Sequence, residues 1–248
     1  MLAQNNKGNY TFISGIGPFS AAVKAQPGFE IVHARLLPLI ALADGYQHVE
    51  RHLQEANRPL EALCGMELRI PSVLSREAFD QFNAPYVERL KNWGLEIAGT
   101  NPVTRTNVAF ESNRVTEPTL AGFYYTMPSS QRFESFVLSG APEIASREGG
   151  VQIVARGDTS LEGLRQKLDC ILNVLAVHLS EMNLKWEMAT AVNLYTVFDV
   201  HALLATVFLP RLGAASHAGV TWHYARPPVS GLDLEVDARA VRSELVLA

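Results

Sequence analysis

Two stretches of this chain, F-I-S-G-I-G-P at residues 12–18 and V-L-S-G-A-P at residues 137–142, carry the same pattern. Each is an apolar run that ends in Ser-Gly, with Pro close behind. The two serines, Ser14 and Ser139, are 139 − 14 = 125 residues apart, which is about half of the 248-residue chain. A repeat of this length predicts that one structural unit is present twice.

The segments that follow each copy also correspond. A second β-rich run comes next, at residues 29–34 and 151–155, and we expect each run to form a hairpin with the strand before it. An amphipathic helix follows, and Thr159 and Glu162 have the spacing of a capping box at the start of the second one. The helices are expected at residues 44–56, 79–93, 160–182 and 204–212. Apolar residues recur there at three- and four-residue steps, as a largely aromatic stripe in the second helix and a leucine stripe in the third. The remaining strands are expected at residues 65–70, 105–111, 119–126, 191–197, 220–224 and 232–241.

Each half is therefore expected to have the order β-β-α-β-α-β-β in roughly 120 residues, which is near the usual domain size. The turn-rich segment at residues 127–132 marks the boundary. We expect a first module at residues 1–128, a second module at residues 129–248, and a fold of the α+β class.

Composition and charge exclude several classes of function. With 48% hydrophobic and 19% charged residues, the chain has an ordinary globular composition. Its 21 basic and 25 acidic residues give a net charge of −4 without a basic block, so nucleic-acid binding is not expected. The apolar stretch at residues 31–43 is too short and too interrupted to span a membrane, and the first residues lack a signal-peptide layout. Cys64 and Cys170 are expected to be buried, reduced thiols, which suits a cytoplasmic location.

Motifs for metal, dinucleotide and nucleophilic chemistry are incomplete. His48 and His52 are four residues apart, but no Glu directly follows the first His, and the P-C-x-x-C of zinc deaminases is absent. The glycine-rich segment at residues 15–20 lacks the third glycine of a dinucleotide loop. Ser14 and Ser139 do not stand in G-x-S-x-G. We therefore expect no metal and no organic cofactor.

Arg105 is the most informative polar residue. It stands at the start of an expected strand, in N-P-V-T-R-T-N-V at residues 101–108. An arginine beside a turn can bind a carboxylate through its planar, bidentate fork. The alternative is a solvent-exposed arginine at a strand end.

Together, this order and these motifs resemble the RidA/YjgF family of enamine/imine deaminases. The resemblance covers most of the second half and is weaker in the first. It rests on S-G-A-P at residues 139–142, N-L-Y-T-V at residues 193–197, A-R-P-P-V-S-G-L-D-L-E-V at residues 225–236, I-G-P-F-S at residues 16–20, and Pro102 with Arg105.

The resemblance implies roles for individual residues. Arg105 corresponds to the arginine that binds the substrate carboxylate, and Asn107 to the residue that offers a backbone N–H. Glu235 corresponds to the functional glutamate of the family. Gly140, and more loosely Gly15, correspond to the glycine whose backbone faces substrate and water.

Each half also departs from the family pattern. Phe19 replaces an early tyrosine and lacks its hydroxyl, and His217 stands in the second half where the family has its arginine. Both are expected to contact the substrate. Neither half holds the complete set, so we expect the working cleft to combine Arg105 of a first module with Glu235 of a second. Glu143 is a further candidate acid.

The resemblance implies a chorismate-mutase-like fold, in which each module is a sheet with two helices on one face. Family members form rings of three modules. Three chains of two modules could build two rings, so we expect a homo-oligomer, with a trimer favoured.

The function implied is hydrolytic deamination of an enamine or imine acid, with a 2-aminomuconate-like ring-cleavage product as the expected substrate. Arg105 would hold the small-molecule carboxylate substrate while water attacks the C–N carbon, and ammonia and a 2-oxo acid would be released. Two alternatives stay open: a non-catalytic, regulatory binder of small carboxylates, and an isomerase on the same fold.

Overall fold

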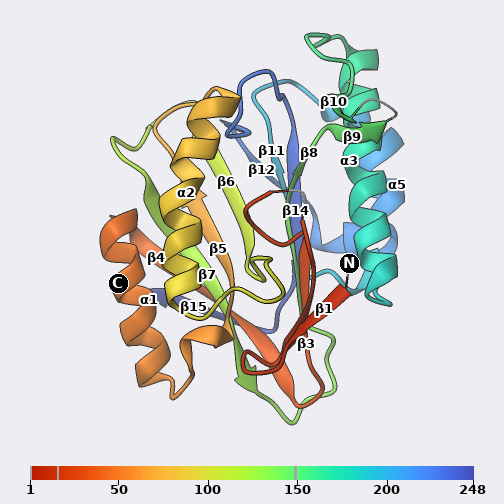
Figure 1. The fold of residues 1–248 in the computed structure, drawn as a ribbon. Helices are drawn as coiled ribbons and strands as arrows, with labels where there is room; N and C mark the ends of the chain where they lie inside the picture. The colour runs from red at the N-terminus through yellow and green to blue at the C-terminus, as the bar shows by residue number, and fades with distance from the viewer. Residues whose placement is uncertain (1, 16, 148–149) are drawn as a thin grey trace.

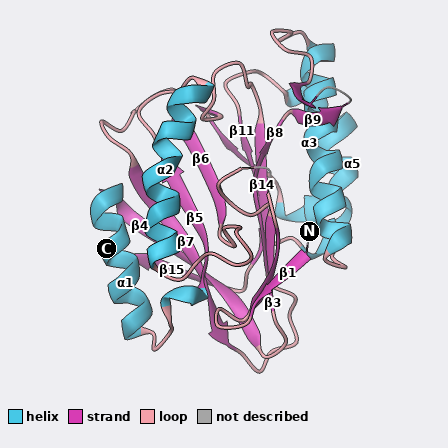
Figure 2. Ribbon diagram, in the orientation of Figure 1, coloured by secondary structure: helices cyan, strands magenta, loops and turns pink. Residues whose placement is uncertain are grey.

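The computed structural model describes residues 2–15, 17–147 and 150–248. These residues form two large β-sheets that lie between two layers of helices (Figures 1 and 2), and a separate two-stranded sheet of β9 and β10. Ile16, part of the expected I-G-P-F-S motif, lies outside the described residues.

The first sheet contains six strands of the described chain, in the order β13-β6-β5-β7-β4-β15. Helices α1 (Leu42–Glu55) and α2 (Arg76–Asn92) cover its outer face (Figure 1). The Ser75 hydroxyl accepts the Ala78 N–H at 3.1 Å and so caps the start of α2. The strands are β4 (Phe29–Ala41), β5 (Leu63–Arg69), β6 (Thr104–Phe110), β7 (Thr119–Pro128), β13 (Ala225–Arg226) and β15 (Ser243–Leu247).

The second sheet has the order β1-β2-β3-β8-β14-β11-β12 in the part of the chain that is described. Its outer face is covered by α3 (Leu161–Glu181) and by a broken helix made of α4 (His201–Leu203), a π-helical segment (Leu204–Phe208) and α5 (Leu209–Leu212). The strands are β1 (Leu2–Asn5), β2 (Tyr10–Ile13), β3 (Ala22–Ala25), β8 (Phe136–Pro142), β11 (Ala191–Tyr195), β12 (Thr221–His223) and β14 (Glu235–Ala240).

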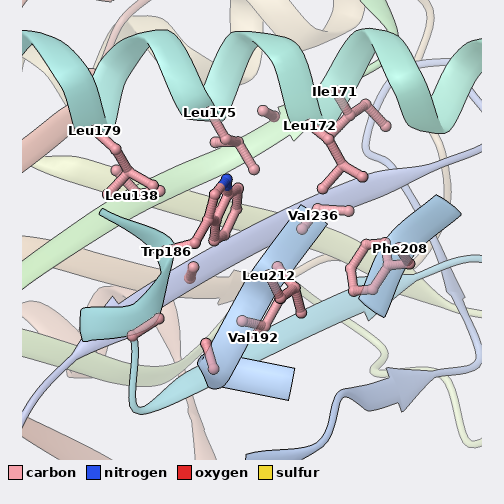
Figure 3. Close-up of a cluster of buried hydrophobic side chains, with 14 of the residues drawn as sticks. Leu138, Ile171, Leu172, Leu175, Leu179, Trp186, Val192, Phe208, Leu212 and Val236 are labelled. Carbon is pink, nitrogen blue, oxygen red and sulfur yellow. The ribbon is translucent and has the colours of Figure 1, made fainter. Parts of the chain in front are cut away.

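Between α3 and this sheet lies a large apolar core (Figure 3). Leu172 and Leu175 of α3 belong to the same buried cluster as Val236 of β14, and Phe208 and Leu212 of the broken helix complete it. The helix therefore forms where its leucine stripe predicts it. Its cap is Ser160, whose hydroxyl accepts the Gly163 N–H at 3.2 Å, and not the neighbouring Thr159.

The two halves repeat one topology. Each sheet contains four strands in an equivalent order, β6-β5-β7-β4 in the first and β12-β11-β14-β8 in the second. In both sets, the first, second, third and fourth strands along the chain occupy the same relative places in the sheet. Each set of strands carries two helical segments on one face, so the expected chorismate-mutase-like α+β architecture is confirmed.

Both predicted hairpins are wrong. The strand β2 pairs with β1 and β3, whereas β4 pairs with β7 and β15 in the other sheet. Similarly, β10 (Gly150–Ile153) pairs with β9 (Ile144–Arg147) and not with β8. The short strand β3 takes the hairpin position beside β2 that was assigned to β4. Since β4 buries side chains on both faces, its pattern alone does not say which sheet it joins.

The ends of the chain are exchanged between the sheets. The N-terminal strands β1–β3 extend the sheet of the second half, and the C-terminal strand β15 extends the sheet of the first half. The chain passes from the first sheet to the second between β7 and β8, where the module boundary is expected. It also changes sheet before β4, on both sides of β13 and before β15. The division at residue 128 stays a prediction, because neither sheet is built from one of these ranges alone.

Candidate active site

A cavity of about 1350 Å³ opens between the two halves. Its walls come from the loop after β2, the first turn of α2, the strands β6, β8 and β14, the β9–β10 hairpin and α3. Residues singled out from the sequence gather here: Gly15, Phe19, Arg105, Asn107, Gly140 and Glu235 all line the cavity.

Arg105 is a buried cation that forms no ion pair with a carboxylate of the described residues. Its residue is only 2% exposed, and Nε, Nη1 and Nη2 have no hydrogen-bond partner among the described residues. The guanidinium carbon lies 4.8 Å from the ring centroid of Phe19 and 4.7 Å from that of Tyr86. Phe79 and Phe82 are at 5.5 and 6.0 Å. Ring faces stabilise a cation but leave its N–H groups unbonded, so the arrangement suits an anionic ligand.

The solvent-exposed alternative for Arg105 is thus wrong. Burial lowers the pKa of its guanidinium, although an arginine remains charged at any ordinary pH. The aromatic residues of α2 that the sequence indicated as a core stripe are partly the walls around this cation. Their spacing predicted a buried face of the helix, but not what that face covers.

Ser139 fixes the strand that carries Arg105. The backbone N–H of Arg105 donates to the Ser139 hydroxyl at 3.0 Å, and that hydroxyl donates to the backbone oxygen of Ser20 at 2.5 Å. The serine of the repeated Ser-Gly motif therefore ties β6 of the first sheet to β8 of the second and to the segment that precedes β3. Its role here is structural, in line with the absence of a nucleophile motif.

Glu235 faces the same cavity from β14, where it pairs with Pro142 of β8 and Tyr195 of β11. It is 3% exposed. Burial has the largest effect on its carboxyl group and the nearby charge of Asp237 the next largest, and both raise the pKa well above the usual range. The opposing effect of Arg105 is smaller. A protonated carboxylic acid at neutral pH can donate a proton to a bound ligand.

Gly140 makes room for this carboxyl group. A Cβ atom at position 140 would lie 1.9 Å from Oε1 of Glu235 and 2.7 Å from its carboxyl carbon. The requirement for glycine is therefore steric: the carboxyl group of Glu235 occupies the space beside the Gly140 backbone.

Asp237 is a functional candidate that the sequence reasoning missed. Its carboxylate accepts hydrogen bonds from the hydroxyls of Thr106 at 2.7 Å and Tyr195 at 3.0 Å, and from Nδ2 of Asn193 at 2.7 Å. Thr106 belongs to the first sheet and the other two donors to the second, so the carboxylate joins the sheets. The period-2 pattern of β14 places Asp237 on the same face as Glu235, which was the available signal.

Glu143 and His217 do not line the cavity. The buried Glu143 carboxylate accepts the backbone N–H groups of Asp233 at 2.6 Å and Leu234 at 3.1 Å. Burial raises its pKa to about 7. It thus holds the segment that leads into Glu235. His217 is exposed, in the 3₁₀ helix Gly213–Ala218, so it does not replace the arginine in the second half.

In the described ranges, no group of three or more His, Cys, Asp or Glu residues is arranged to hold a metal ion. Cys64 is buried, and burial raises the pKa of its thiol. Cys170 is only half-buried and lines the cavity, contrary to the expectation. Within these ranges, no helix has the length and apolar character needed to cross a membrane.

The chain is thus a protein of the chorismate-mutase-like class, with two modules and a buried arginine in the cleft between them. The crystal structure of a chorismatase has the same fold, with a TM-score of 0.55 over 97% of this chain and 79% of that chain at 12% sequence identity. The chain belongs to the family described as 2-aminomuconate deaminase CnbZ, whose model matches residues 2–245. It is 37% identical over 246 residues to a 2-amino-5-chloromuconate deaminase of Comamonas testosteroni, with 97% of this chain and 96% of that protein covered.

The family assignment confirms the expected deaminase of the 2-aminomuconate type, an enzyme that acts on a C–N bond. Neither the regulatory binder nor the isomerase is favoured by these findings.

Proposed function

We propose that the chain hydrolyses a 2-aminomuconate-like enamine acid to ammonia and a 2-oxo acid, without a metal. The observation that carries this proposal is Arg105, a buried cation whose three nitrogens have no partner among the described residues and which faces the cavity. The name of the Comamonas testosteroni relative, a 2-amino-5-chloromuconate deaminase, indicates the substrate class.

Substrate binding follows from the surroundings of Arg105. Its planar fork can take both oxygens of the carboxylate next to C2, and the poorly solvated site strengthens this pairing. The rings of Phe19 and Phe79 offer flat apolar surfaces for a conjugated diene. Binding therefore places C2 in the cleft, between β6 and the wall that carries Glu235.

Glu235 supplies proton transfer in this proposal. Protonation of the enamine carbon by the neutral carboxylic acid gives an iminium ion, whose C2 is electrophilic. The carboxylate formed then takes a proton from the water that attacks C2, which restores the acid. The resulting carbinolamine loses its nitrogen as ammonia, and its hydroxyl oxygen becomes the 2-oxo group. Overall, one substrate molecule and one water molecule give one 2-oxo acid and one ammonia.

Ammonia release by Arg105 variants tests the proposal. Arg105→Ala should lower kcat/KM by the equivalent of about 2–5 kcal/mol, as expected for loss of a buried charge partner. Arg105→Lys should recover little, because lysine lacks the fork. Arg51→Ala, on the exposed face of α1, is the matched control. Unchanged kcat/KM in Arg105→Ala would refute the assignment, and carboxylate binding without ammonia release would favour the binder.

Metal independence has its own test. Activity should survive dialysis against a strong chelator, with metal content measured before and after. Loss of activity that a stoichiometric metal restores would overturn this part of the proposal.

We also propose a cytoplasmic homo-oligomer, with a trimer favoured. Exposed apolar side chains at the β15 edge of the first sheet support assembly: Leu37 is 68% and Val246 is 65% exposed. Light scattering of the purified protein should give a multiple of 27.2 kDa, and a monomer at micromolar concentration would refute it. The buried Cys64 thiol suits a reducing compartment, which fractionation of the source cells would check.

A further inference from the structure

Asn107 presents an unpaired amide to the cavity, close to Arg105. The two residues are two positions apart on β6, so their side chains leave the same face of the strand, with Cα atoms roughly 7 Å apart. Asn107 is 4% exposed, and neither its Oδ1 nor its Nδ2 has a hydrogen-bond partner among the described residues. A buried amide without partners is costly to a folded protein, so one that lines a cavity points to a ligand.

Two other asparagines, Asn193 and Asn101, show the usual pairing. Nδ2 of Asn193 donates to Asp237, and Oδ1 of Asn101 accepts the Val103 N–H while its Nδ2 donates to Pro18. Asn83 on α2 is also 4% exposed with both amide atoms unpaired, but it does not line the cavity. Asn83 therefore provides a matched control for the cost of an unpaired buried amide.

Arg105 and Asn107 differ in the hydrogen-bonding groups that they offer to a ligand. A guanidinium only donates, so Arg105 can bind a carboxylate but cannot recognise an N–H group on the neighbouring carbon. An asparagine amide offers both a donor and an acceptor. In this cleft, Nδ2 can add a hydrogen bond to the carboxylate while Oδ1 accepts from the nitrogen at C2.

We propose that the Asn107 side chain determines specificity for the nitrogen at C2 of the substrate, by accepting its N–H at Oδ1. This inference rests on the proposed function, because Arg105 must first place the carboxylate. It also explains product release. The 2-oxo product carries an acceptor at C2 where the substrate carries a donor, so Oδ1 would meet another acceptor and the product would bind more weakly.

Two stable planar probes test the inference without turnover. Pyrrole-2-carboxylate carries an N–H beside the carboxylate-bearing carbon, and furan-2-carboxylate is a similar ring with an oxygen acceptor in that place. The dissociation constants of both are measured by titration calorimetry for the wild type and for Asn107→Leu, Asn83→Leu and Arg105→Ala. Asn107→Ser, whose side chain is shorter and lacks the amide, provides a second variant if the leucine variant does not fold.

The wild type should prefer pyrrole-2-carboxylate by about tenfold, the value of one net hydrogen bond. Asn107→Leu and Asn107→Ser should lose this preference, Asn83→Leu should keep it, and Arg105→Ala should bind both probes at least tenfold more weakly. A preference that survives in both Asn107 variants, or its absence in the wild type while binding still needs Arg105, overturns the inference alone. Failure of the wild type to bind either probe, or binding that does not need Arg105, overturns the proposed function and the inference with it.

Discussion

Alanine at position 140 should disable the enzyme by displacing Glu235. The new Cβ would lie 1.9 Å from Oε1, whereas ordinary van der Waals contact begins at 3.4 Å, so the carboxyl group must move by about 1.5 Å (3.4 − 1.9). Gly140 has no positive φ, so the strand itself accepts alanine. The three atoms nearest to the new Cβ all belong to Glu235, so the clash falls on this side chain first.

The expected loss follows from what Glu235 supplies. Proton transfer by a positioned acid contributes about 10²- to 10⁴-fold to rate, and a displacement of about 1 Å can cost on the order of 10²-fold. Gly140→Ala should therefore lower kcat for ammonia release by about 10²-fold or more. Because Arg105 is untouched, pyrrole-2-carboxylate should still bind.

A double-mutant cycle isolates this cause. Glu235→Ala removes the carboxyl group that the new methyl group would strike, so adding Gly140→Ala to it should cost little more activity. Circular dichroism and thermal melting verify that all three variants fold. Wild-type activity in Gly140→Ala, or losses that multiply in the double variant, would show that Gly140 does not act through Glu235.

Three further changes test other parts of the structure. Asp237→Asn removes a negative charge that raises the pKa of Glu235, so the fall in kcat at high pH should move to lower pH; an unchanged pH profile would contradict this coupling. Glu143 has a pKa of about 7, above its usual 4.5, so the folded protein binds this proton more tightly and stability declines as pH rises from 4.5 through 7. Glu143→Gln cannot titrate, so between pH 5 and pH 8 the wild type should lose about 2–3 kcal/mol of unfolding free energy relative to this variant, and denaturant melts with parallel pH dependence would disprove it. Residues 1–128 and 129–248 expressed separately should each be inactive, because β1–β3 and β15 lose their partner sheets. Mixing the two pieces should restore activity, and full activity from either piece alone would refute the shared cleft.

The sequence alone predicted the elements that depend on neighbours along the chain. The leucine stripe of α3 and the aromatic stripe of α2 are local periodicities, and both helices lie where these predict. The repeated Ser-Gly pattern indicated two similar modules. Arg105 could be singled out because a fork of N–H donors beside a turn has a recognisable chemistry.

Only the tertiary structure decided which strands pair and which side chains meet when these are distant in sequence. Nothing local in β1–β3 or β15 says that they join the sheet of the opposite half, since the backbone of a strand can pair with any sheet edge of suitable register. Packing between distant segments also decides which candidate residues lie in the cleft. Glu143 and His217 were candidates from the sequence, but hydrogen bonds hold the Glu143 carboxylate to the backbone before β14, and His217 is exposed. The aromatic rings around Arg105 and the fit of Glu235 over Gly140 depend on packing between elements, which only the folded chain brings together.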